Sequence, residues 1–407
     1  MLGALIVASG MAFLLGSALG VALPAIQSSF RAELSAVQWV MNAHLLVESA
    51  LLPASGALAD LYGRRRTFVI GIVLFGLSGG ASALVPDIPS LIVTQACQGF
   101  GGALMIPGSL ALIQTHIREA DRGLAIGVWA GVSAATAACG APLGGVLVET
   151  AGWRSIFALV VPLSAMAALL CWTAIPASRP APTGQRPDWT GTLLLAASLF
   201  GLSYALIFLP HANDDSGRAS GRPPELAGLA GAALLVAFVF WQRRARHPMI
   251  PGRLFEHRDV IAANLITVLL YCALNGTLTF STFYLQQIQA FPPRAAGLAF
   301  LPTVILIAIF SGPGGALADR RGLRFPLVLG TLLVGAGICW IYVTLVRARP
   351  DSDGANLALL AYTQEAPGIV GGYWQFYARH FIPALMMIGL GMAAVLAPVS
   401  RGAMRVA

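Results

Sequence analysis

The chain has 407 residues, of which 57% are hydrophobic and 10% are charged, and its mean hydropathy is +0.77. So little polar surface excludes an ordinary water-soluble globular protein and indicates a protein that lies in the lipid bilayer. The formal net charge is +8, and all 25 basic residues are arginines. These arginines lie between apolar segments and not along one polar face, which argues against nucleic acid as a partner.

Apolar stretches of about 20 residues, each long enough to cross the hydrocarbon core, predict a bundle of membrane-spanning helices. The first stretch is longer than the hydrophobic region of a signal peptide and lacks a charged flank, so we interpret it as a span. In chain order the twelve predicted spans are 2–24, 38–59, 67–86, 90–115, 123–147, 154–176, 189–210, 225–242, 260–288, 296–317, 325–346 and 381–400. The sequence therefore predicts an all-α integral membrane protein.

The arginines indicate the orientation of these spans. If the N-terminus is cytoplasmic, the breaks after the even-numbered spans hold 17 arginines and the opposite side holds 8. Basic residues gather on the cytoplasmic side of membrane proteins. We therefore expect a multi-pass protein of the cell membrane (the inner or cytoplasmic membrane) with its N-terminus in the cytoplasm.

One loop segment occurs twice, and the shift between the copies is 315 − 56 = 259 positions. The first copy joins the second and third spans, and the second copy joins the tenth and eleventh, so eight spans separate equivalent positions where a plain duplication would give six. The shared positions are Gly56, Asp60, Gly63 and Arg64 in the first copy, and Gly315, Asp319 and Gly322 in the second.

This count predicts three parts. A six-helix N-terminal bundle spans residues 1–176, two linker helices with a basic cytoplasmic loop span 177–258, and a C-terminal bundle spans 259–407. The C-terminal bundle has four spans where six are expected, so we expect it to lack the last two.

Further motifs follow the repeated loop in a fixed order along the chain. They lie at Gln98–Ser109, at Gly140, Pro142, Gly144 and Gly145, at Trp153–Arg154, at Asp188–Trp189, at Tyr284–Gln287 and at Gly389–Pro398. Together these motifs resemble the major facilitator superfamily, and within it the fourteen-helix drug:proton antiporter branch. The resemblance covers nearly the whole chain. It implies a major facilitator fold and the export of small amphipathic or cationic compounds in exchange for protons by alternating access.

Two of these motifs have a direct physical reading. Asp60 can pair with Arg64 at the membrane surface, and such a cluster can hold one of two bundle arrangements. A plain basic loop that fixes topology is the alternative. Glycines around Gly140 permit close helix packing and Pro142 bends its helix, although Ala141 departs from the Gly-Pro pair of the family pattern.

Several positions depart from the proton-coupling pattern of the family. Leu15 stands where an aspartate is common, Gly20 replaces an asparagine, Gln95 replaces an arginine and Val160 replaces an asparagine. Export by proton exchange requires a side chain that gains and loses a proton inside the membrane. The usual residues for that task are therefore largely missing.

His44 and Glu48 are the alternative candidates for proton coupling. They lie four residues apart in the second span, so they share one helix face near the middle of the membrane. A carboxylate beside an imidazole can exchange a proton, and we hypothesise that this pair is the proton carrier. A structural ion pair that faces another helix is an equally open interpretation.

A substrate pocket is expected at mid-membrane between the bundles, lined by polar and aromatic groups on apolar helices. A hydrogen bond between helices is the alternative role for each candidate. The candidates are Asn42, Gln95, Trp129, Tyr271, Asn275, Thr279 and Gln286.

The sequence gives no sign of catalysis. It has no phosphate-binding loop of the Gly-x-x-x-x-Gly-Lys type, no readable nucleophile and base, and five cysteines without metal-ligand spacing. We therefore predict no enzyme activity, no cofactor and no metal, with the lipid bilayer, a small-molecule substrate and the proton as partners and no obligate protein partner. The alternatives to drug export are a facilitator or symporter of a small metabolite, and a non-transporting or degenerate membrane protein.

Overall fold

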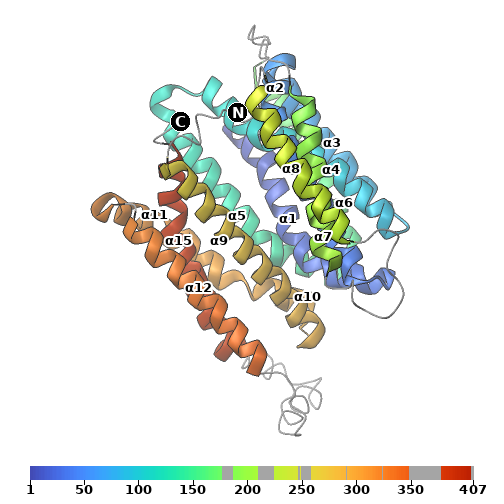
Figure 1. Ribbon diagram of the computed structural model, residues 1–407, viewed down its shortest axis with the longest axis vertical. Coiled ribbons are helices and arrows are strands. Elements are labelled where there is room, and N and C mark those ends of the chain that lie inside the picture. The colour runs from blue at the N-terminus through green and yellow to red at the C-terminus, as the bar shows by residue number, and fades with distance from the viewer. Residues whose placement is uncertain are drawn as a thin grey trace. The chain divides into compact units, whose positions relative to one another are not determined.

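The computed structural model describes residues 1–176, 187–209, 224–245, 248, 258–289, 291–322, 324–347 and 377–404 (Figure 1). Within these ranges every regular element is a helix. Twelve helical segments among the described residues are long and apolar enough to cross a membrane. This confirms the predicted all-α membrane fold and its number of spans. In lipid, a helix is the form that satisfies its own backbone hydrogen bonds, so long apolar segments become helices.

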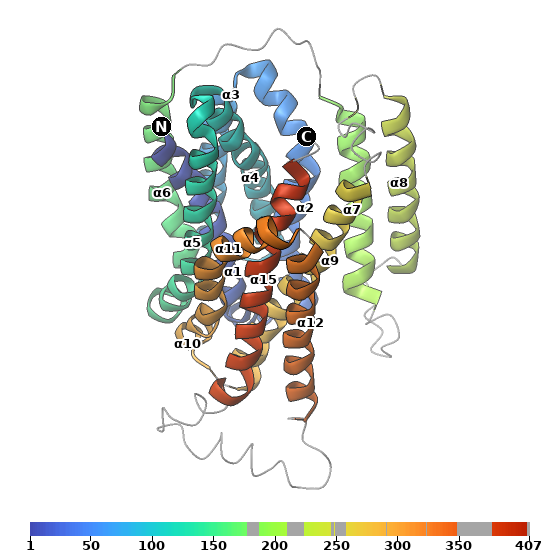
Figure 2. The same cartoon turned by 90° about the vertical axis from the view of Figure 1, so that its left-hand side faces the viewer.

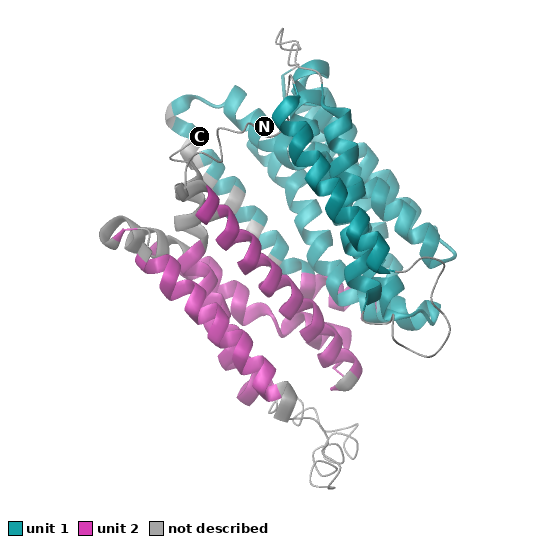
Figure 3. Ribbon diagram, in the orientation of Figure 1, with its two compact units in different colours: residues 1–140, 150–252 teal, residues 141–149, 253–407 magenta. Residues whose placement is uncertain are grey.

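The chain divides into two compact units, which Figure 3 colours separately: residues 1–140 with 150–252, and residues 141–149 with 253–407. The first unit therefore includes the two predicted linker helices. Its helices are α1 (Leu2–Phe30), α2 (Leu34–Tyr62), α3 (Arg64–Leu84), α4 (Ile88–His116), most of α5 (Glu119–Ala151), α6 (Arg154–Ala174), α7 (Trp189–Phe208) and α8 (Pro224–Arg244).

The second unit contains residues 141–149, near the C-terminal end of α5, and the helices that follow α8. These are α9 (Arg258–Phe283) with the π-helical turn η3 (Tyr284–Ile288), α10 (Pro293–Leu298), α11 (Leu301–Arg321), α12 (Arg324–Arg347), and α15 (Ile382–Met404) preceded by the π-helical turn η4 (Tyr377–Phe381). The predicted span 296–317 is interrupted between α10 and α11. Pro302 explains the new start, because a proline has no N–H and is tolerated in the first turn of a helix.

Small residues bring the helices of the first unit into close contact. A Cβ atom on Gly101 of α4 would lie 2.7 Å from the Phe75 nitrogen and 2.8 Å from the Gly71 oxygen, both on the backbone of α3. Backbones approach this closely only where a side chain is absent. α4 is therefore packed tightly on α3, and it also packs on α2.

The helices α7 and α8 form an antiparallel hairpin whose members lie side by side (Figure 2). Asp188 precedes α7 and accepts hydrogen bonds from the Gly191 amide, the Trp241 indole and the Gln242 amide. The hairpin contacts α2: the centroids of the Trp39 ring of α2 and the Phe200 ring of α7 lie 5.1 Å apart. The two predicted linker helices are thus held together at one end by a single carboxylate.

Candidate functional site

The His44–Glu48 pair predicted from the sequence is formed in the structure. Nε2 of His44 lies 3.3 Å from Oε2 of Glu48, and the two side chains are 13% and 14% exposed. Glu48 is 48 − 34 = 14 residues from the start of α2 and 62 − 48 = 14 residues from its end. At a rise of 1.5 Å per residue, the carboxylate is therefore about 21 Å from either end of the helix.

Glycines of α4 cover this pair. A Cβ atom on Gly99 would lie 2.2 Å from the His44 carbonyl oxygen, and one on Gly102 would lie 3.4 Å from the carboxyl carbon of Glu48. The edge of the His44 ring meets Phe75 of α3 at 6.0 Å between centroids, with an interplanar angle of 82°. The pair is thus enclosed by α3 and α4 and does not project freely into lipid.

One atom of the pair is unsatisfied. Nδ1 of His44 is buried and has no hydrogen-bond partner among the described residues. Buried polar atoms in folded proteins nearly always have a partner, which is often an ordered water. Nδ1, the ring nitrogen that does not face Glu48, can therefore take a further hydrogen bond.

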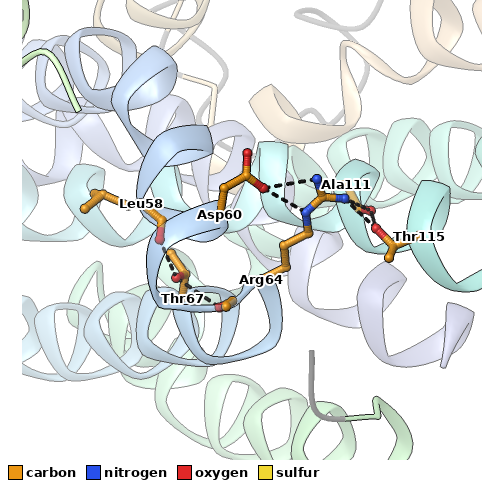
Figure 4. A network of polar contacts seen from close by, with 7 residues as sticks. Leu58, Asp60, Arg64, Thr67, Ala111 and Thr115 are labelled. Carbon is orange, nitrogen blue, oxygen red and sulfur yellow. Dashed lines mark hydrogen bonds and ion pairs between the residues drawn. The ribbon is translucent and has the colours of Figure 1, made fainter. Parts of the chain in front are cut away.

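The repeated loop forms a tight junction between α2 and α3 (Figure 4). Gly63 joins the two helices with φ 93°. Arg64 donates from Nε to Asp60 Oδ1 at 3.1 Å, and its Nη1 donates to Ala111 O at 3.3 Å and to Thr115 Oγ1 at 2.5 Å. One guanidinium therefore links the end of α2 to the last turns of α4, as the fork geometry of arginine allows.

The next arginine extends the junction to α6. Arg65 donates a hydrogen bond to the Trp172 carbonyl, and its guanidinium lies over the Trp172 ring at 4.5 Å. The first loop copy therefore connects four helices of the first unit.

The second loop copy has the same backbone form. Gly322 ends α11 with φ 80°, and it is 322 − 63 = 259 positions after Gly63. A positive φ favours glycine, so the repeat preserves a backbone requirement. Gly315 and Asp319 lie in the last turns of α11, and their side-chain surroundings lie outside the described part of the structure.

Gln95 belongs to a polar cluster between α3 and α4. Its Nε2 donates to Ser82 Oγ at 3.1 Å and to Gln98 Oε1 at 2.8 Å. Ser82 in turn donates to Thr94 Oγ1 at 2.9 Å, and Gln98 Nε2 donates to the Phe75 carbonyl at 3.2 Å. We call Ser82, Thr94, Gln95 and Gln98 the α3–α4 polar cluster.

Gln95 is a predicted pocket residue and Gln98 lies in a predicted motif, but their contact with Ser82 and Thr94 was not predicted. Gln95 and Gln98 are three residues apart, and Ser78 and Ser82 are four apart, so each pair lies on one face of an otherwise apolar helix. That spacing is a signal that was available in the sequence. Which helix the polar face would meet was not available, because it depends on tertiary packing.

The other pocket candidates fall on both units. In the first unit, Asn42 is half-buried on α2, and Trp129 on α5 is buried and donates from Nε1 to Ser9 Oγ at 3.1 Å. In the second unit, Asn275 donates to the carbonyl of Tyr271, and both side chains are exposed, whereas Thr279 and Gln286 are half-buried. A common pocket for these residues stays a prediction.

The helix-packing motif of α5 contacts two different helices. A Cβ atom on Gly140 would lie 2.4 Å from the Leu14 oxygen of α1, and one on Gly145 would lie 2.4 Å from the Pro293 oxygen of α10. Pro142 lies inside α5, and Gly144 is buried. The glycines are thus placed where neighbouring backbones approach closely.

Comparisons with known proteins agree with the motifs. The sequence model described as Major Facilitator Superfamily matches residues 5–407. Puromycin resistance protein pur8 of Streptomyces alboniger is 33% identical over 384 residues, which cover 94% of this chain and 70% of that protein. The Tetracenomycin C resistance and export protein of Streptomyces glaucescens is 32% identical over 80% of this chain and 59% of that protein. The chain therefore spans 59–70% of the lengths of these two relatives.

Solved structures support the fold. A bacterial homolog to the human lysosomal transporter Spinster has a TM-score of 0.57 at 16% identity and covers 100% of this chain and 78% of that chain. The D-xylose-proton symporter has a TM-score of 0.56 at 16% identity and covers 97% of this chain and 80% of that chain. At this identity the likeness concerns the fold alone.

Proposed function

Because the chain belongs to the major facilitator superfamily, a family of multi-pass membrane transporters, we propose that it exports small amphipathic or cationic compounds in exchange for protons. Two relatives carry names that refer to puromycin resistance and to tetracenomycin C resistance and export, which favours a drug-like substrate. The transport step is alternating access, in which two bundles rock around a central site. We further propose the cell membrane as its location, with the N-terminus in the cytoplasm.

The observation that carries this proposal is the His44–Glu48 pair at the midpoint of α2. An acid in the hydrocarbon region is costly, so such residues are rare and usually serve transport. The pair offers one exchangeable proton in a chain that has Leu15 and Gln95 at positions where the family commonly has ionisable residues. A carboxylate at this depth also favours a cation over an anion as substrate.

The three-part organisation remains part of this proposal, with bundles at 1–176 and 259–407 and linker helices within 177–258. The repeated loop, with Gly63 and Gly322 at matched positions, supports a duplicated origin. We propose that Asp60 and Arg64 hold the first copy in one of two arrangements during transport. Substrate contacts are proposed for Asn42, Gln95, Trp129, Tyr271, Asn275, Thr279 and Gln286.

The test is the flux of a dye cation in proteoliposomes under an imposed pH gradient, with wild type and Glu48→Gln compared. We expect gradient-driven flux in the wild type and its loss in the variant, at equal amounts of inserted protein. Glu33→Gln is the matched control, because Glu33 is an exposed glutamate that precedes the same helix.

Three outcomes separate the possible functions. Unchanged flux in Glu48→Gln removes the pair as proton carrier and favours a facilitator or symporter. Gradient-driven flux lost in both glutamate variants shows a general defect and removes the special role of Glu48. No flux of any tested compound from well-inserted wild type favours a non-transporting protein.

A further inference from the structure

The α3–α4 polar cluster forms a continuous series of hydrogen bonds inside an apolar bundle. It runs from the half-buried Thr94 through Ser82 and Gln95 to Gln98, whose amide reaches the Phe75 carbonyl. Gln95 and Gln98 are both 0% exposed. Polar side chains at this depth are costly in lipid, so a cluster of four suggests a role beyond holding two helices together.

Two buried atoms beside this series have no partner among the described residues: Oε1 of Gln95 and Nδ1 of His44. One is an acceptor, and the other accepts or donates according to the tautomer of the ring. Buried positions of this kind are the usual binding places of ordered water in proteins. Oε1 of Gln95 in the cluster and Nδ1 of the neighbouring His44 can therefore each take a hydrogen bond from water.

The cluster is adjacent to the His44–Glu48 pair. The residue whose carbonyl accepts from Gln98 is Phe75, and the ring of Phe75 contacts the ring of His44. Gly99, the residue after Gln98, packs on the backbone of His44. The inner end of the cluster and the pair thus share the same α2–α3–α4 contact.

The outer end of the cluster lies about two helical turns from Asp87, the residue that precedes α4. Asp87 precedes α4 and accepts from the amide and the hydroxyl of Ser90 at 2.8 and 2.6 Å. These hydrogen bonds, the hydroxyl first, lower the pKa of Asp87, so this exposed carboxylate stays charged and attracts cations. Ser90 and Thr94 are four residues apart, so they lie on one face of α4 between Asp87 and the cluster.

We propose that the α3–α4 polar cluster binds ordered water and forms the route by which protons from the Asp87 side of the membrane reach the His44–Glu48 pair. A hydronium ion at the surface gives its proton to the first water, and each water passes one proton to the next. The last water loses a proton to the carboxylate of Glu48, where an O–H bond forms. The glutamine amides orient the waters and do not take up the proton.

Other ionisable groups on the helices that pack on α2 do not offer a comparable route. α1 has none in its sequence, and α3 has only the arginines 64–66 in its first turn. α4 has Cys97, which is exposed, and His116 in its last turn, while α7 has Tyr204 next to Trp39. Among the described residues of these helices, the polar cluster is the group of hydrogen-bonded side chains that lies beside the pair.

This inference rests on the proposed role of Glu48, and its test can be read without transport. The protein is reconstituted in vesicles and sorted by the side on which an N-terminal tag is exposed. Because three helices separate the N-terminus from Asp87, the two lie on opposite membrane sides. The pH is then changed quickly on one side, and the carboxylic acid band of Glu48, identified by its loss in Glu48→Gln, is followed by infrared difference spectroscopy.

We expect the Glu48 band to respond faster to a pH change on the Asp87 side. Gln95→Leu should slow this response about tenfold, because it removes the two hydrogen bonds that the Gln95 amide donates and the oxygen that would hold a water. Thr94→Val should slow it less, and it replaces Gln95→Leu in the test if that variant does not fold. Thr173→Val is the matched control, because Thr173 is exposed on α6 and bonds only to its own helix.

Two results would overturn the route: an unchanged response in folded Gln95→Leu and Thr94→Val, or a wild-type response that is faster from the side of the N-terminus. The proposed function fails separately. If the cluster variants slow the response of the Glu48 band but the protein moves no dye, the proton route is supported and the export function is not. If dye flux depends on Glu48 but the cluster variants leave the rate of the Glu48 response unchanged, the export function is supported and the proton route is not.

Discussion

Replacement of Gly99 with alanine should force α2 and α4 apart beside the His44–Glu48 pair. The new Cβ atom would lie 2.2 Å from the carbonyl oxygen of His44 and 3.0 Å from its carbonyl carbon. Ordinary contact begins at 3.4 Å, so the atoms overlap by 3.4 − 2.2 = 1.2 Å. The obstacle is helix backbone and not the end of a flexible side chain, so one helix must move as a whole.

The size of the effect follows from two opposing terms. Overpacking of a well-packed site costs about 1–3 kcal/mol, and the depth of this overlap places Gly99→Ala at the upper end. Alanine regains about 0.5–1 kcal/mol over glycine in a helix. We therefore expect Gly99→Ala to lower the free energy of unfolding by about 2 kcal/mol.

The assay is reversible unfolding in mixed micelles, followed by tryptophan fluorescence during titration with SDS. Gly16→Ala is the control, because Gly16 is exposed on α1 and a Cβ atom there meets nothing within 4 Å. This variant should gain about 0.5–1 kcal/mol from helix propensity alone. If the two variants are equally stable, the close crossing of α2 and α4 at Gly99 is wrong.

Three further outcomes are expected. Gly63→Ala should lower the free energy of unfolding by about 1–3 kcal/mol, because φ 93° is strained for any side chain; a neutral result in the SDS titration would contradict that backbone form. Arg64→Lys should reduce dye flux without loss of insertion, because one ammonium cannot hold both the end of α2 and Thr115. Unchanged flux in Arg64→Lys would show that a positive charge at position 64 is enough for transport. Asp188→Ala should destabilise the α7–α8 hairpin by about 1–2 kcal/mol and shift the indole N–H resonance of Trp241, which loses its acceptor; an unmoved resonance would exclude that hydrogen bond.

The sequence determined those features whose physical cause is local. The membrane spans could be predicted because an apolar segment in lipid must form a helix to satisfy its backbone hydrogen bonds. Hydropathy and length are therefore enough to locate them. The His44–Glu48 contact was readable because residues four apart on a helix are neighbours before any tertiary structure forms. The repeat of Gly63 at Gly322 was visible in the sequence, but the structure was needed to show that both glycines have a positive φ.

The tertiary structure decided which faces meet. Gln95 was predicted as a pocket residue, and its amide bonds to Ser82 of α3, a contact between residues 95 − 82 = 13 positions apart. The polar spacing on each helix was visible, but the choice of partner depends on how the small residues of α3 and α4 let two backbones approach. For the same reason, the sequence of α2 alone could not predict that Gly99 and Gly102 of α4 pack against the His44–Glu48 pair. Helix formation in a membrane depends on each segment by itself, whereas helix pairing depends on two surfaces at once, and only the folded chain brings those surfaces together.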